Sequence, residues 1–289
     1  MRSSRYRLLR IPRERGRLIA VVALGILVVL ILAGMSSLLS SQPGELAASR
    51  AVSDSDIPQD NLIYDRSGQV LLADTHFGGA RRYHTSLGQE GKWLPSATVA
   101  IEDANFWHEG GIDPAAILRA ALADLSRHRI VQGGSTIVQQ LVKQRVTGDS
   151  ETLFRKLREA VIATQINGTT SKQQILEMYL NTVFYGNNAY GGQAAAQTFF
   201  HIDANQLDLA QASMLAGLPQ NPNADNPLLH WDAARHRQRQ VLDAMVRNNS
   251  ITAKQSDQAY AEDLRAPQHM FGDQPSSLAP AFTDWINQQ

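Results

Sequence analysis

The chain has 289 residues, of which 43% are hydrophobic and 19% are charged, as expected for one sizeable globular domain with short appendages. Its 27 basic residues balance 27 acidic ones, but seven arginines lie in residues 1–17, which leaves 20 basic against 26 acidic residues in the rest. This mildly acidic body argues against a protein that binds nucleic acid. The absence of cysteine excludes a disulfide framework and a thiolate zinc site.

Residues 18–39 are almost wholly apolar and carry no charge. A helix of about 20 such residues is roughly 30 Å long and spans the hydrocarbon core of a bilayer, and the run exceeds the roughly 7–15 apolar residues of a cleaved signal peptide. We therefore predict a membrane-spanning helix at 18–39. The arginine-rich residues 1–17 should form a cytoplasmic tail, since positive flanks are retained on that side, so the remainder should face outward from the cell membrane.

For the rest of the chain we predict a stalk at 40–60, a folded domain at 61–250 and a tail or the start of a linker at 251–289. Two short apolar runs around Asp65–Gly68 predict a β-hairpin. From residue 97 onward the apolar spacing is helical, so the domain should be mainly α with a small β-hairpin at its start. The predicted helical runs are 97–106, 114–128, 136–145, 151–166, 172–180, 189–200, 207–216 and 231–248.

An acidic pair, Glu102 and Asp103, stands at the end of an apolar helical run, just before Phe106 and Trp107. A carboxylate half-buried beside these rings would lose hydration, which raises its pKa and makes it a better base. The alternative is a helix end with solvated acids.

The segment 132–143 places two glycines before a helical run, with Ser135 as its expected cap. Gln139 and Lys143 are four residues apart and share a face, which supplies an amide and a cation for a phosphate or a sugar. The alternative is an ordinary capped amphipathic helix.

Arg155 and Glu159 also stand four residues apart, a spacing that equally describes a solvated surface pair. The next helical run, at 172–180, has an apolar face typical of a core helix. Lys172 begins this run, and Asn181 follows it directly. None of these four clusters is decisive alone.

Together, in this order, the clusters resemble the five motifs of the family 51 glycosyltransferases, which polymerise peptidoglycan alone or as the first domain of class A penicillin-binding proteins. The resemblance runs from about residue 62 to 245. The matching residues are Glu102, Asp103, Phe106, Gly111 and Asp113; Gly133–Ile137 with Gln139–Lys143; Arg155, Lys156 and Glu159; Lys172, Ile175–Glu177 and Tyr179–Asn181; and Ala212, Leu215–Gln220 and Pro222.

The resemblance implies a lysozyme-like fold and a reaction that polymerises lipid II onto a growing glycan strand with inversion and release of undecaprenyl pyrophosphate. Glu102 matches the general base, and Glu159 matches a second essential carboxylate that orients cations or a metal. A divalent cation, Mg²⁺ or Mn²⁺, is one option for this site, and no organic cofactor is expected. The implied partners are the bilayer and proteins of a cell-wall synthesis complex. The substrate-binding positions implied are Asp103, Phe106, Ser135, Thr136, Gln139, Gln140, Lys143, Arg155, Lys156, Lys172 and Asn181.

Some positions depart from the family pattern: Glu109 stands where histidine is usual, and Asp225 where tyrosine is usual. Two alternatives stay open, a lytic enzyme of lysozyme-like fold and an inert membrane-anchored scaffold. The cationic pair Arg155 and Lys156 counts against the first, since cleaving a glycan releases no pyrophosphate. We also expect no transpeptidase activity in this stretch of chain, because it contains no Ser-x-x-Lys.

Overall fold

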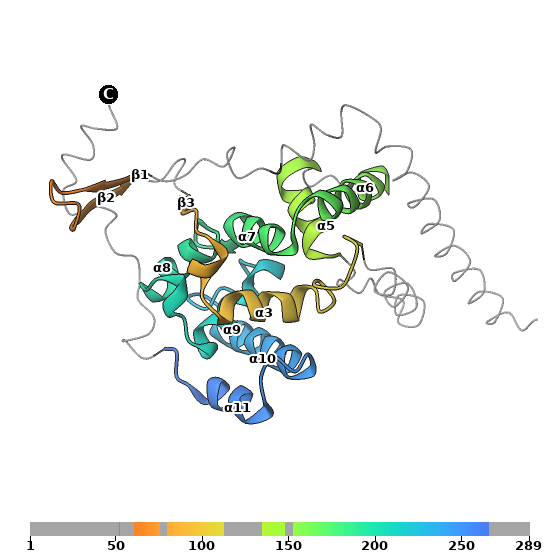
Figure 1. The fold of residues 1–289 in the computed structure, drawn as a ribbon. Helices are drawn as coiled ribbons and strands as arrows, with labels where there is room; N and C mark the ends of the chain where they lie inside the picture. Colours follow the sequence, from red (N-terminus) through yellow and green to blue (C-terminus); the bar gives the residue numbers. More distant parts are fainter. Residues whose placement is uncertain (1–51, 53–60, 76–79, 113–134, 148–152, 266–289) are drawn as a thin grey trace, which may run out of the picture.

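The computed structural model describes Val52 and residues 61–75, 80–112, 135–147 and 153–265 (Figure 1). The predicted membrane-spanning helix, the cytoplasmic tail and the helical run 114–128 lie outside the described residues. Within the described part, no helix is long and apolar enough to cross a bilayer. This part is mainly helical, as the apolar spacing predicted, and it also contains two small sheets.

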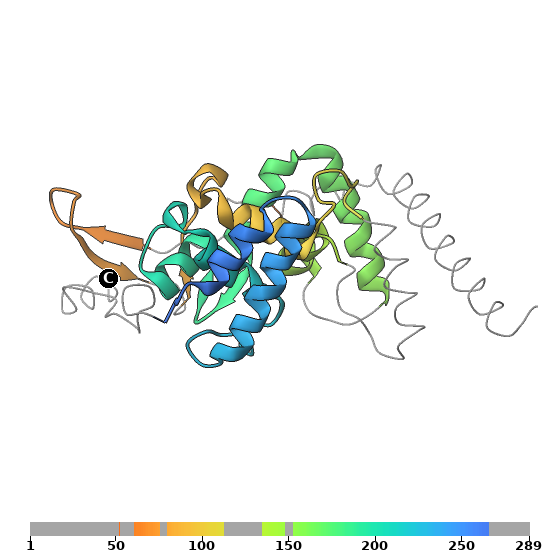
Figure 2. The same cartoon turned by 90° about the horizontal axis from the view of Figure 1, so that it is seen from below.

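The predicted β-hairpin is present as the antiparallel strands β1 (Asn61–Tyr64) and β2 (Leu71–Thr75). Its turn is organised by Asp65, whose carboxylate accepts a hydrogen bond from the Ser67 hydroxyl (2.7 Å). Gly68 adopts a φ of +72°, which costs glycine little. The hairpin lies at one end of the molecule, far from α5 and α6 in both Figure 1 and Figure 2.

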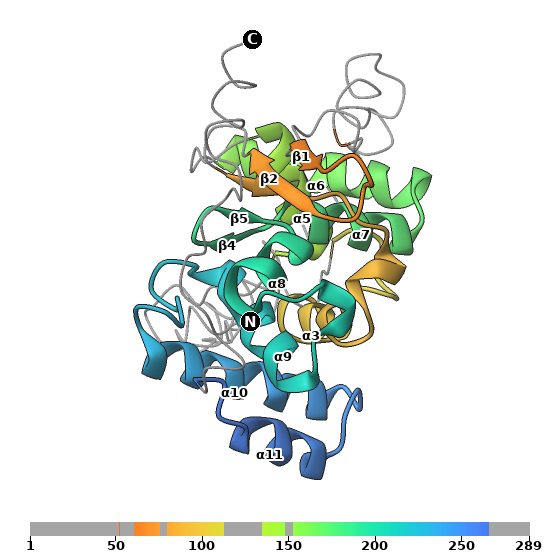
Figure 3. The ribbon, with the colours of Figure 1, turned by 90° about the vertical axis from the view of Figure 1, so that its left-hand side faces the viewer.

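Three helices pack against one another to form the centre of the domain: α3 (Trp93–Glu102), α9 (Leu209–Gly217) and α10 (Trp231–Arg247). Helix α9 is buried along nearly its whole length and is rich in small residues, which lets its neighbours approach closely. The packed core continues past the boundary that we placed at residue 250, because α11 (Ala253–Ala261) lies against α10 (Figure 3).

A second group of helices lies beside α3: α5 (Ile137–Val142), α6 (Leu153–Thr169) and α7 (Lys172–Thr182). Helix α5 packs against both α6 and α7 and continues into the π-helical turn η4 (Lys143–Thr147). Its cap differs from our expectation. Thr136 caps α5, because its hydroxyl accepts the backbone N–H of Gln139 while the Gln139 side chain accepts the N–H of Thr136.

The sequence did not predict the second sheet, which has the strand order β3 (Arg81–Arg82), β5 (Ala189–Tyr190), β4 (Phe184–Gly186). Strands of two or three residues are too short to show an alternating pattern. Because β5 occupies the start of the predicted run 189–200, helix α8 (Gly192–Phe200) begins three residues later than we predicted. Short 3₁₀ turns connect these elements: η3 (Leu87–Glu90), η5 (Ala204–Gln206) and η6 (Leu218–Gln220).

Helix α3 spans 93–102 rather than the predicted 97–106. The earlier start is compatible with Pro95, which lies in the first turn, where proline is tolerated. The helix ends at Glu102 because Asp103 leaves the helical region, with φ −158° and ψ 80°.

Candidate active site

The end of α3 places the two acids of the first cluster in different roles. Asp103 turns back so that its carboxylate accepts the backbone N–H of Ile137 (3.0 Å), the first residue of α5. Glu102 accepts on Oε2 a hydrogen bond from the Nε2 of Gln140 (2.8 Å), one turn further along α5. Asp103 therefore secures the start of α5, and Glu102 remains available for chemistry.

Glu102 is a buried carboxylate with one cation nearby. Its side chain is 10% exposed, and the Nη2 of Arg237 lies 3.7 Å from its Oε1. Burial raises the pKa of Glu102 above its usual value, while the bond from Gln140 and the charge of Arg237 act in the opposite direction. A carboxyl group with a raised pKa binds a proton more strongly than a solvated one, which suits a general base.

Glu159 is the centre of a different cluster, although the sequence allowed a solvated surface pair. Its side chain is fully buried, it forms an ion pair with Arg155, and its Oε2 lies 3.4 Å from the Nζ of Lys156. The Thr147 hydroxyl donates to its Oε1 (3.0 Å). Lys156, with its side chain 47% exposed, also donates to the Ser135 hydroxyl (2.6 Å). The cluster holds two cations around one buried anion.

Helix α5 and the residues before it connect the two glutamate clusters. Gln140 on α5 binds Glu102, and its Oε1 accepts the Tyr179 hydroxyl of α7 (3.0 Å). Ser135, just before α5, binds Lys156 of the other cluster. A displacement of α5 would therefore disturb both carboxylates at once.

Lys172 lies beside the first cluster, with its Nζ 4.5 Å from the centre of the Phe106 ring. Phe106 is fully buried. Burial lowers the pKa of Lys172, and the charges of Glu109 and Asp103 act to raise it. A cation over an aromatic face is a favourable contact, so Phe106 helps to hold Lys172 in place.

Several predicted substrate-binding residues have their polar atoms engaged within the fold. The Asn181 Oδ1 accepts the backbone N–H of Thr85 (2.9 Å) and its Nδ2 donates to the Thr85 carbonyl (2.8 Å). The Thr136 hydroxyl donates to the carbonyl of Gly111 (2.8 Å). With the capping amide of Gln139, these bonds stabilise the scaffold around the two glutamates. Lys143 stands at the junction of α5 and η4.

A family model described as Transglycosylase matches residues 70–246. The chain belongs to the transglycosylase family. It is similar to the penicillin-binding protein 1A of Aquifex aeolicus, with 41% identity over 207 residues that cover 72% of this chain and 28% of that one. The protein of the same name from Neisseria flavescens is 38% identical over 202 residues, 70% of this chain and 25% of that one. The matched segment thus spans about a quarter of the length of these relatives.

Among solved structures, the crystal structure of penicillin-binding protein 1A from Haemophilus influenzae is similar with a TM-score of 0.44 and 24% identity. The alignment covers 81% of this chain and 24% of that chain. The family match confirms the family that the motifs predicted, and it implies that the chain is a glycosyltransferase.

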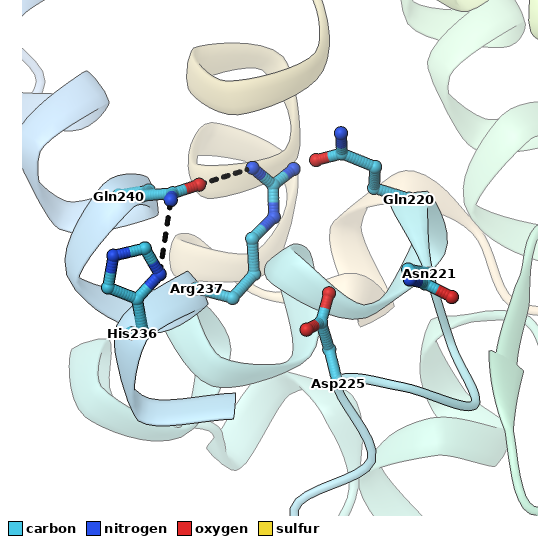
Figure 4. Close-up of a pocket in the computed structure, with 6 residues that line it drawn as sticks. All are labelled: Gln220, Asn221, Asp225, His236, Arg237 and Gln240. Atoms are coloured by element: carbon cyan, nitrogen blue, oxygen red, sulfur yellow. Dashed lines mark hydrogen bonds between the residues drawn. The ribbon is translucent and has the colours of Figure 1, made fainter. Parts of the chain in front are cut away.

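The candidate site includes one residue that we did not predict from the sequence, Arg237 of α10. Its guanidinium lies 3.7 Å from Glu102, and its side chain lines a pocket of about 360 Å³ (Figure 4). A signal existed: Arg237 lies three residues after Ala234 and four before Val241, both fully or almost fully buried, so a cation occupies the apolar face of the helix. The pocket residues besides Arg237 are Gln220, Asn221, Asp225, His236 and Gln240.

The described residues around Glu159 do not by themselves supply the ligands of a divalent ion, and such an ion stays an untested expectation. Among the described residues, no group of three or more His, Asp or Glu side chains is placed to hold a metal. Glu159 itself offers a single carboxylate that already faces Arg155 and Lys156. Metal ions of the Mg²⁺ type prefer several oxygen ligands, so we derive no step through a metal.

Proposed function

We propose that this chain is a peptidoglycan glycosyltransferase that polymerises lipid II into β-1,4-linked glycan strands. The observation that carries the proposal is the pair of unlike buried glutamates, one poised for a proton and one surrounded by cations. Such a pair matches a reaction in which a hydroxyl loses a proton at one point while negative charge gathers on a leaving group at another.

In the proposed step, the GlcNAc 4-hydroxyl of incoming lipid II attacks the anomeric carbon of the strand's terminal MurNAc. A new carbon–oxygen bond forms there with inversion. The bond to the pyrophosphate oxygen breaks, and its electron pair leaves with undecaprenyl pyrophosphate. The hydroxyl proton passes to Glu102, since a sugar hydroxyl is a weak nucleophile until a base takes its proton.

The leaving pyrophosphate requires positive charge that is already in position, because preorganised charges need no rearrangement as the bond breaks. Arg155 and Lys156 meet this need beside Glu159, which holds the two side chains near each other. Ser135 fixes the outer of these cations through its hydroxyl. Lys143 follows on the same segment, at the end of α5, and we assign it to the phosphates of the donor as well.

The proposal also includes the finer features that the sequence suggested: a lysozyme-like arrangement of the helices, and anchorage in the cell membrane by residues 18–39 with the domain outside. The lipid tail of the substrate supports this location. A reporter fused after residue 289 should be active only outside the cytoplasm, and activity on the inner side would overturn the predicted orientation.

The test of function uses the full chain in detergent or vesicles with fluorescent lipid II. We expect high-molecular-weight polymer that a muramidase degrades to disaccharide units. Absence of polymer from folded protein would refute the proposal. Cleavage of preformed glycan strands would instead identify the lytic alternative, which the cations around Glu159 disfavour because that reaction releases no pyrophosphate.

A further inference from the structure

Arg237 is held in place by three contacts. Its Nε donates to the carbonyl of Gly217 (3.1 Å), its Nη1 donates to the Oε1 of Gln240 (2.9 Å), and its Nη2 faces Glu102 at 3.7 Å. A Cβ on Gly217 would lie 2.7 Å from the Cγ of Arg237, so a larger residue there would push the arginine aside. With its side chain only 12% exposed, the guanidinium has a defined position rather than a mobile surface one.

We propose that Arg237 is a positioning residue for Glu102, which turns the Oε1 of that carboxylate toward itself and keeps the carboxylate in its ionised, proton-accepting form. The proposal rests on the function proposed above and extends it, because it explains how a deeply buried glutamate can still act as a base. Glu102 Oε1 is buried and has no hydrogen-bond partner among the described residues, so the positive charge of Arg237 is its main compensation.

The charged and titratable groups around Glu102 support this reading. Asp103, on the same turn, acts to raise the pKa of Glu102, and Arg237 acts to lower it. Tyr179 and Tyr185 are fully buried, and burial holds the pKa of each phenol well above its usual value, so both stay neutral. Arg237 is therefore the cation that opposes the effects of burial and of Asp103.

A second carboxylate, that of Asp225, lines the same pocket as Arg237 and also acts on its charge (Figure 4). The His236 side chain lines the same pocket and lies 3.3 Å from the Nε2 of Gln240. When Glu102 accepts a proton it loses its negative charge, and Asp225 still balances the guanidinium. Arg237 can thus stay in place through the reaction, because both Glu102 and Asp225 act on its charge.

The test is the pH dependence of kcat for lipid II polymerisation by the full chain. In Arg237→Gln, loss of a cation within 4 Å should move the acid limb of the kcat–pH profile to higher pH by about one to three units. At neutral pH, kcat should therefore fall by at least about tenfold. The KM for lipid II should change little. Activity should return at high pH. Arg237→Lys, which retains the charge, should recover most of the shift.

Asp225→Asn gives a prediction of opposite sign and does not depend on how well the Arg237 variants fold. Without the competing anion, the charge of Arg237 stabilises the ionised form of Glu102 more strongly. The acid limb of the kcat–pH profile should therefore move slightly toward lower pH. Arg239→Gln is the matched control. Arg239 lies on the same helix but pairs at the surface with Asp243 (3.1 Å) and Asp257 (3.0 Å), and its loss should leave the limb unchanged.

The outcomes separate the two proposals. If the wild type and Arg239→Gln form no polymer, the proposed function fails. If they form polymer and Arg237→Gln keeps the wild-type acid limb, or if Asp225→Asn shifts it upward, the role assigned to Arg237 is wrong. A decrease in kcat that is equal at every pH would mean a purely structural role and would also contradict the inference.

Discussion

Glu102 and Glu159 are the same residue type, both are buried, and they have different surroundings. Glu159 has two cations from its own helix, at sequence separations of three and four residues. Glu102 has an amide from α5 and a single arginine from the distant α10. The comparison supports the division of roles that we propose: the carboxylate with one nearby cation is assigned to take a proton, and the carboxylate with two is assigned to organise positive charge.

A third glutamate completes the series. Glu90, at the end of η3, is fully buried. Its Oε1 accepts the Thr85 hydroxyl (2.5 Å), and the like charge of Glu177 acts on it. Burial raises the pKa of Glu90 to about 7. Within the described residues no cation contributes to this value, so Glu90 represents the case of zero cations.

The largest effect should come from Glu102→Gln. This change preserves the shape and the contact with Gln140 but removes the base, so the chemical step should fall by about 10² to 10⁴, the range typical of general-base catalysis. The measurement is the single-turnover rate with labelled lipid II, with a thermal melt as the control for folding. A rate within about threefold of wild type, well outside that range, would assign the base elsewhere.

Glu159→Gln should reduce turnover by another route. It removes the buried anion that Arg155, with its side chain 12% exposed, pairs with on α6. The affinity for the pyrophosphate donor should therefore change, and the fold should lose about 3 kcal/mol. Donor KM and urea unfolding measure the two effects. Thr147→Val is the matched control, because it removes one hydrogen bond to Glu159 and should cost only about 1 kcal/mol.

Glu90 should make the fold less stable as the pH rises from about 4.5 to 7. In this window the folded state keeps a proton that the unfolded chain releases, since the folded pKa is about 7 against a usual 4.5. Stability is therefore greatest below the window and declines by about 3 kcal/mol across it. Urea unfolding at a series of pH values should show this slope in the wild type and a flatter one in Glu90→Gln. Equal slopes would contradict it.

A smaller effect should follow from Gly111→Ala. Gly111 has a φ of +91°, and an added Cβ would lie 2.5 Å from the carbonyl oxygen of Ala163 on α6. The backbone strain and overlap should destabilise the fold by about 2 kcal/mol and disturb the contact with Thr136. Gly110→Ala is the matched control, because its Cβ would meet nothing within 4 Å and should change stability little.

The sequence predicted the parts of this site whose partners are near in the chain. Arg155 and Glu159 were paired by helical spacing, and the hairpin around Asp65 by alternating runs beside a turn. It did not predict the ion pair between Glu102 and Arg237, because nothing local connects α3 with α10. Burial also could not be read from the spacing, which is why Glu159 was equally compatible with a surface pair.

The positions that differ from the prediction have causes that are distant in the sequence. Helix α3 ends at Glu102 because Asp103 leaves the helix to accept the N–H of Ile137, a tertiary contact that no helical pattern contains. Asn181 was expected to meet the substrate, but its amide binds the backbone of Thr85; its direct contact with substrate stays a prediction. In each case a distant backbone group determined the position of a polar side chain.

The most direct test of the account measures two quantities in parallel for Glu102→Gln and Glu159→Gln: the single-turnover rate with saturating lipid II and the affinity for the pyrophosphate donor. The account predicts that the two variants separate, with Glu102→Gln losing rate while its donor affinity is preserved, and Glu159→Gln changing in affinity as well. Two variants that lose rate and affinity to the same extent would contradict the division of roles between the two glutamates.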